Sequence, residues 1–239
     1  MSKLNIKKYE IRFSKAKGVI EIPPPQNKPT DPYLLAYSAA LHLLVRTKYL
    51  FLAIIHESKK RNTYAGFVLV RSFFETCMAL GYLAIKLDKK SKTNDIEGVW
   101  QLSHRILQGG KHFPASEYRP EVKKENVPAI NIYDYLDEVD KDYRRIGGKE
   151  TTTPHREVYD TILSEFGHPN FLGLITCSWL EKGEDDINKE LVGLSRSCTK
   201  GDKNGYFIYL DWGSAIFFHY WDKLFILFEK FGLNLPSLK

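Results

Sequence analysis

The stretch from Ala65 to Ile85 is apolar on nearly every side of a helix, yet it contains two opposite charges, Arg71 and Glu75, four residues apart. A helix that is hydrophobic all round is typical of the buried interior of a bundle. Residues four apart lie on the same face of a helix, so the two charges can meet. The chain must therefore surround this helix with other apolar elements and satisfy an ion pair in its middle.

Composition favours a folded protein with one main domain. The chain has 239 residues, of which 43% are hydrophobic and 13% aromatic, which excludes disorder for most of its length. The three cysteines are too few and too unevenly spaced for a disulfide framework. With no signal-like amino terminus, the simplest expectation is a reducing, cytoplasmic location.

Two segments, 33–55 and 65–85, are long enough to cross a membrane. Each contains charged side chains, Arg46 and Lys48 in the first and Arg71 and Glu75 in the second. A charge at the centre of a bilayer costs about 2.5 to 3.5 kcal/mol on insertion scales. We interpret both segments as core helices of a soluble protein and expect no membrane partner.

Helix start and stop signals predict a mostly α-helical bundle. Asp31 and Pro32 begin a helix that runs to about residue 59, and a second helix runs to about residue 87. The short connection between them predicts a long antiparallel pair. Helical patterns follow at 95–107, 132–146, 154–166 and 214–231, where the last is rich in aromatic residues and ends at Gly232.

Two parts of the chain favour small β pieces instead. Apolar and polar residues alternate from Tyr9 to Phe13, so a short hairpin is expected before the prolines at 23–29. Segments 171–177 and 191–195 are predicted as strands within residues 171–205. We therefore predict two units: a basic amino-terminal segment with a proline-rich linker over 1–29, and a single helical-bundle domain over 30–239.

The basic residues are unevenly distributed. The net charge is +6, and the first twenty residues alone carry +5. Further basic clusters occupy 59–61 and 86–92. A basic balance permits the binding of a polyanion, but it says little about the fold.

The Arg71–Glu75 pair has two interpretations. As a structural ion pair it fixes the register of a buried helix, which is the commoner role of such pairs. As part of a pocket it binds an anion or orients a second group, with Ser72 beside it. Both interpretations stay open from the residues alone.

A second polar segment runs from Tyr159 to Asn170. Asp160, Ser164 and His168 have the residue types of a hydrolase triad, but Pro169 moves His168 out of the helix and Ser164 lies on no nucleophile elbow. His168, held between a glycine and a proline, remains a candidate site residue. The other histidines have no metal-ligand spacing, so neither a metal nor a cofactor is expected.

Two of these motifs, 69–75 and 163–170, together resemble a family of uncharacterised bacterial helical proteins placed near the HEPN superfamily (higher eukaryote and prokaryote nucleotide-binding helical bundles). The similarity in layout covers about residues 31 to 232. It implies an HEPN-like bundle in which Arg71, Glu75 and His168 converge, with Asn170 nearby. Active HEPN ribonucleases have an arginine closely followed by a histidine, and the only comparable pair here, Arg105 and His112, is interrupted by two glycines.

The leading hypothesis is a cytoplasmic protein that binds RNA or a nucleotide-like anion. Processing of that ligand, as by a ribonuclease-like hydrolase, would use His168 as acid–base and Arg71 and Glu75 beside the phosphate. Ser72, Tyr159 and Asn170 are candidate binding residues. Roles in defence systems, common among HEPN relatives, enter by analogy alone.

The alternative hypothesis is a non-catalytic helical module in which the polar cluster is structural. Its candidate partner is a second copy of the chain, bound through helical faces such as the aromatic last helix. An amidase or esterase that uses Ser164 ranks below both hypotheses.

Overall fold

The structure is a computed structural model that carries no ligand or partner chain. It describes residues 5–17, 20, 31–60, 63–108, 130–147, 154–164, 180–183, 186–192 and 205–239.

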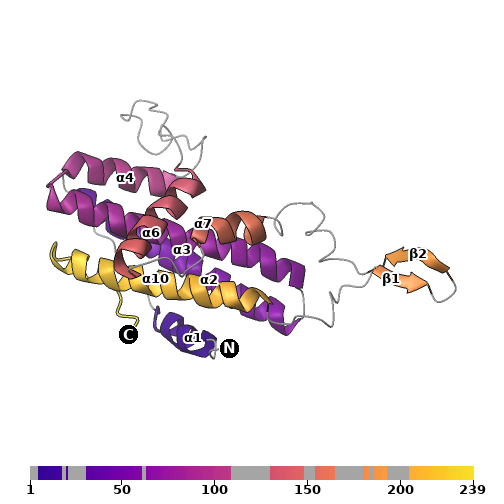
Figure 1. The fold of residues 1–239 in the computed structure, drawn as a ribbon. Coiled ribbons are helices and arrows are strands. Elements are labelled where there is room, and N and C mark those ends of the chain that lie inside the picture. The colour runs from indigo at the N-terminus through magenta and orange to yellow at the C-terminus, as the bar shows by residue number, and fades with distance from the viewer. Residues whose placement is uncertain are drawn as a thin grey trace, which may run out of the picture.

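Three long helices form the body of the protein: α2 (Asp31–Lys59), α3 (Thr63–Lys92) and α10 (Gly205–Glu229). Helix α3 packs against both of the others and lies in the middle of the bundle (Figure 1). Because α2 ends four residues before α3 begins, the two run in opposite directions. The predictions of a mostly helical bundle and of a long antiparallel pair are confirmed.

The core is built around the apolar positions of α3. Phe73, Phe74 and Leu80 are completely buried there, and Phe217 and Trp221 of α10 are 1% exposed or less. Full burial of such side chains contributes about 1.5 to 3 kcal/mol each. The aromatic residues of the last helix therefore belong largely to the core.

Shorter helices cover the sides of α3. Helix α4 (Ile96–Gln108) packs on α2 and α3, and α6 (Ile132–Gly147) packs on α3. The single turn α7 (His155–Val158) continues into a π-helical turn, η1 (Tyr159–Leu163), which contacts both α7 and α3. Single π-helical turns are frequent at functional sites, and this one places Tyr159 beside the middle of α3.

The amino-terminal hairpin that we predicted is wrong, because residues Ile6–Ser14 form helix α1. Tyr9 and Phe13 alternate with polar residues but are also four apart, which is a helical spacing. Both side chains are buried against Phe218 of α10, with ring centroids 5.5 and 4.7 Å away, whereas Ile11 between them is exposed. Arg12 also binds Asp222 of α10 at 2.9 Å. Packing against α10 thus determines that this segment is a helix and not a strand.

Two short strands, β1 (Leu180–Gly183) and β2 (Asp186–Val192), pair antiparallel with Leu180 opposite Val192. Strand β1 lies outside the two segments that we predicted as strands. The segment 171–177 lies outside the described residues; of the segment 191–195, Leu191 and Val192 belong to β2 and the remaining three residues lie outside the described ranges.

Two helical segments, Pro32–Lys59 and Ala65–Lys92, are long and apolar enough to cross a membrane by length and composition. In α3, 67% of the apolar window is buried inside the bundle, whereas only 39% of the window in α2 is buried. The burial of α3 is that of a core helix, and α2 has one outer face that the described residues leave uncovered.

The crossing of α3 with α6 and α10 requires a glycine at position 81. A Cβ atom there would lie 2.8 Å from Val139 Cγ2 and 3.0 Å from Tyr220 Cδ2. We expect Gly81→Leu to lower the free energy of unfolding by about 2 to 3 kcal/mol through overpacking. Urea denaturation measures this loss, with Glu10→Leu on exposed α1 as the control; an equal effect of the two substitutions would contradict the packing.

Candidate functional site

Arg71, Glu75 and Tyr159 form one hydrogen-bonded cluster between α3 and η1. Arg71 Nε donates to Glu75 Oε1 at 3.1 Å, and Arg71 Nη2 donates to the Tyr159 hydroxyl at 3.0 Å. The Tyr159 hydroxyl in turn donates to Glu75 Oε1 at 2.7 Å. The three groups therefore satisfy one another in a closed triangle that ties η1 to α3.

Burial and the hydrogen bonds within the cluster shift the pKa values of Tyr159 and Arg71. Burial, together with the hydrogen bond to Glu75, raises the pKa of Tyr159 to about 12. Burial of Arg71 opposes its charge, but the hydrogen bonds with Glu75 and Tyr159 outweigh that effect and raise its pKa. The side chains of Arg71 and Glu75 are 23% and 33% exposed, so the cluster reaches solvent and is less deeply buried than the sequence suggests.

The other predicted site residues are placed differently. Ser72 contributes its carbonyl oxygen to a separate contact on the α2 side, where it accepts the Thr76 hydroxyl at 2.7 Å. Arg46 Nε of α2 donates to that same hydroxyl at 3.1 Å. His168 and Asn170 lie outside the described residues. Of the predicted site, the structure thus brings together Arg71, Glu75 and Tyr159, and the convergence with His168 stays a prediction.

We expect Tyr159→Phe to lower the free energy of unfolding at pH 7 by about 1 to 2 kcal/mol, because two hydrogen bonds are lost. A raised pKa means that the stabilisation is complete below pH 10 and is lost as the pH rises toward about 12. The difference between wild type and Tyr159→Phe should therefore shrink across that interval in urea denaturation. Tyr49→Phe, at an exposed tyrosine, is the control, and a constant difference at all pH values would contradict the role of the hydroxyl.

A second polar pair, Asp140 of α6 and His155 at the start of α7, is almost completely buried. Asp140 Oδ1 accepts the backbone N–H of His155 at 2.8 Å and contacts the imidazole Nδ1, while Asp140 Oδ2 accepts the N–H of Arg156 at 3.3 Å. The imidazole is 2% exposed and lies among the rings of Phe74, Tyr143 and Trp212. Sequence reasoning missed this pair, because its members lie 15 positions apart and form no recognisable motif.

Positively charged side chains gather at a pocket between α3, α6 and α10, which we call the basic pocket. Its volume is about 450 Å³. Five cationic side chains line it: Lys89, Lys92, Arg145, Lys223 and Lys230. Two carboxylates, Asp88 and Asp142, also line it, so the lining carries a net charge of +3. Its apolar wall consists of Ala84, Ile85, Ile226 and Leu227.

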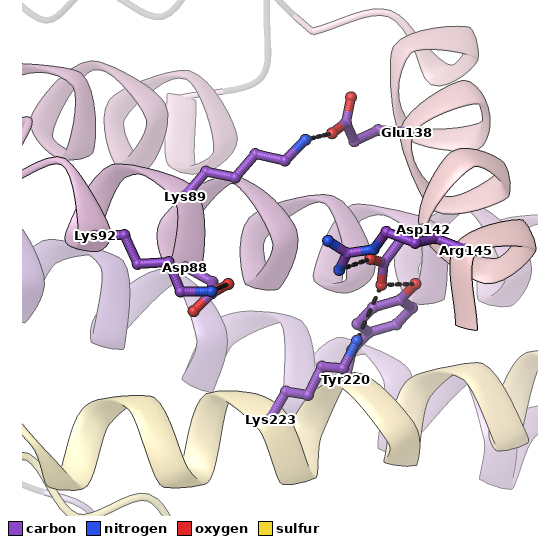
Figure 2. Close-up of polar contacts among 8 residues, drawn as sticks. All are labelled: Asp88, Lys89, Lys92, Glu138, Asp142, Arg145, Tyr220 and Lys223. Carbon is purple, nitrogen blue, oxygen red and sulfur yellow. Dashed lines mark hydrogen bonds and ion pairs between the residues drawn. The ribbon is translucent and has the colours of Figure 1, made fainter.

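Asp142 organises one side of the basic pocket (Figure 2). Its side chain is 5% exposed and accepts hydrogen bonds from Arg145 at 2.8 Å, from Lys223 at 2.9 Å and from the Tyr220 hydroxyl at 3.2 Å. Burial opposes the charge of Asp142, but the hydrogen bonds from Lys223 and Tyr220 outweigh it and hold the pKa below its ordinary value. Asp142 thereby positions two cations at the pocket.

On the opposite side, Lys89 binds Glu138 of α6, and Lys92 binds Asp88 at 2.6 Å (Figure 2). Lys230 lines the pocket without an ion pair among the described residues. The basic run at 86–92 was a visible signal in the sequence. The cations from α6 and α10 could not be recognised from the sequence, because only the fold brings them next to residues 86–92.

Within the described ranges, no group of three or more His, Cys, Asp or Glu side chains is arranged to hold a metal ion. Comparisons of the chain with protein-family models, with curated proteins and with solved structures found no match, so the site rests on its own geometry.

Proposed function

We propose that the protein binds a phosphate-bearing anion, RNA or a nucleotide, in the basic pocket. The observation that carries the proposal is the convergence of five cations, from α3, α6, α10 and the residue that follows α10, on one concavity with two carboxylates. Phosphate oxygens are recognised by such groups of lysine and arginine side chains. A net positive lining also raises the local concentration of anions and their rate of association.

The shape of the pocket supports a nucleotide more than a bare phosphate ion. Its volume of about 450 Å³ lies within the range of about 300 to 1,000 Å³ typical of small-molecule sites. Ile226 and Leu227 of α10 offer apolar surface next to Lys223 and Lys230. A ligand with a flat apolar base and an attached phosphate would use both parts of this surface.

The direct test is calorimetric titration of the full chain with ATP, with a single-stranded RNA of twelve nucleotides and with inorganic phosphate. We expect ATP or the RNA to bind at least about tenfold more tightly than phosphate, a difference of about 1.4 kcal/mol. Equal binding of all three, or none, would overturn the proposal.

Processing of the bound ligand is a separate part of the proposal, and it concerns the Arg71 cluster. An HEPN-like enzyme would use His168 as acid–base, with Arg71 and Glu75 close to the phosphate. The partial exposure of Arg71 and Glu75 supports access of a ligand to them. A bacterial setting and a role in defence belong to the same proposal and rest on the resemblance, whereas the cytoplasmic location rests on the low cysteine content.

Incubation of RNA with wild type and with His168→Ala, each with and without magnesium, tests this part. Cleavage by wild type that is reduced at least about 100-fold in the variant is the expected result for an acid–base residue. Cleavage that is equal in the two proteins, or absent from both, would refute the ribonuclease and leave a binding protein.

The closed triangle of Arg71, Glu75 and Tyr159 favours a second candidate function, a non-catalytic interaction module. In that case the cluster serves only to hold η1 on α3, since its hydrogen-bonding groups already bind one another. RNA binding without cleavage, with unchanged affinity in Arg71→Gln, would select this candidate.

A further inference from the structure

A groove runs along the outer face of α2, on different elements from the basic pocket. It lies between α2, the residues that follow α1, and Pro236, and its volume is about 830 Å³. We call it the α2 groove. Its lining consists of Ala16, Lys17, Ile20, Leu41, His42, Leu44, Val45, Arg46, Lys48, Tyr49 and Pro236.

The α2 groove exposes large apolar side chains. Val45 is 53% exposed and Tyr49 is 67% exposed, and Leu52 continues the same face of the helix as an exposed residue. The spacing of these three residues, four and then three, is that of an apolar stripe on a helix. Exposed apolar side chains that adjoin along a groove mark an interaction site more often than isolated ones do.

The charged side chains that the structure describes in the α2 groove are all basic. Lys17, Arg46 and Lys48 line it together with His42, and none of the lining residues that the structure describes is Asp or Glu. Lys48 Nζ donates to the Ala16 carbonyl at 2.6 Å, which holds this cation at the groove. Arg46 Nε donates a hydrogen bond to the Thr76 hydroxyl, and its other guanidinium nitrogens make no hydrogen bond among the described residues.

We infer that the α2 groove binds an amphipathic helix of a partner protein whose apolar stripe is flanked by Asp and Glu. From Val45 to Leu52 the stripe extends about 10 Å at 1.5 Å per residue, which matches two turns of a partner helix. Helices that dock in grooves insert apolar anchors at such spacings. The positive lining selects acidic flanks and disfavours basic ones.

The same features disfavour two other occupants. A second copy of the chain docked through the same surface would place cations against cations, because a two-fold interface is self-complementary. A bilayer presents a flat surface, whereas this site is concave and is lined by Ile20 and Pro236 as well as by α2.

Two synthetic peptides of 18 residues test the inference by fluorescence anisotropy with the full chain. Both carry the same leucine stripe at helical spacing; one has Glu on its flanks and the other has Lys. The glutamate peptide is expected to bind at least about tenfold more tightly than the lysine peptide. The double variant Val45→Ser/Tyr49→Ser is expected to weaken that binding by about tenfold or more, since it removes the central anchors.

Ile208→Ser is the matched control, because Ile208 is 47% exposed on α10 and lines neither the basic pocket nor the α2 groove. It should change the affinity for the glutamate peptide less than about twofold, and circular dichroism verifies that all variants fold. Equal affinity for the two peptides, or no effect of the double variant, would overturn the inference. Two other results would also overturn it. One is that the wild type binds phosphatidylglycerol vesicles but neither peptide, and the double variant loses the vesicle binding. The other is that light scattering shows a wild-type dimer that the double variant does not form.

Discussion

Replacement of Asp140 by alanine is expected to lower the free energy of unfolding by about 3 to 5 kcal/mol, the range for loss of one partner of a buried polar pair. Asp140 accepts two backbone N–H groups at the start of α7 and contacts the imidazole of His155, which is 2% exposed. The substitution leaves these buried donors without an acceptor, and each unsatisfied donor costs about 1 to 3 kcal/mol.

The matched control is Asp137→Ala on the same helix. Asp137 binds Arg156 at 2.9 Å, but both side chains are close to half exposed, so its loss should cost less than about 1 kcal/mol. Urea denaturation of the two variants at pH 7 makes the comparison. Similar losses in both would contradict the enclosed role of Asp140.

The pH dependence gives a second readout of the same residue. Burial opposes the charge of Asp140, but hydrogen bonds from His155 outweigh it and hold the pKa below the ordinary value of 3.8. A carboxylate with a lowered pKa stabilises the fold above that value, and its contribution is lost as the pH falls through the folded-state pKa. The difference between wild type and Asp140→Ala should therefore diminish below pH 3.8.

The second large effect concerns the basic pocket. The triple variant Lys89→Gln/Lys92→Gln/Lys230→Gln is expected to weaken binding of single-stranded RNA by at least about tenfold at 0.1 M salt. Each lysine that neutralises a phosphate contributes about 0.7 to the slope of log affinity against log salt for single strands. Loss of three such contacts should reduce that slope by about 2.

The control is the triple variant Lys7→Gln/Lys8→Gln/Lys60→Gln. It removes the same three charges from exposed positions outside the basic pocket, so the net charge of both variants falls equally. Affinity within about threefold of wild type is expected for this control. Equal loss of binding in the two variants would show that net charge, and not the pocket, governs binding.

The central part of the fold was predictable because it depends on local pattern. The helix over 65–85 is apolar all round, and the structure places it in the middle of the bundle as α3. Helix caps and breakers located most helix starts and ends, including the end of α10 near Gly232, which has a positive φ of 71°. The Arg71–Glu75 contact followed from the spacing of four on one helix.

The rest depends on contacts between distant parts of the chain. The periodicity of Tyr9, Ile11 and Phe13 fits a strand as well as a helix, and only the presence of Phe218 decides between them. Tyr159 was predicted as a binding residue, but its role as the third member of the triangle needs the π-helical turn that aims it at α3. Asp140 with His155, and Asp142 with Lys223, meet only after the helices pack.

The location of the anion site is tested most directly by nuclear magnetic resonance of ¹⁵N-labelled full-length protein titrated with ATP. The proposed function predicts that the amide signals of Lys89, Arg145 and Lys223 shift progressively and that those of Lys7 and Lys8 do not. Signals that shift only around Arg71 and Tyr159, or that shift nowhere, would contradict binding in the basic pocket.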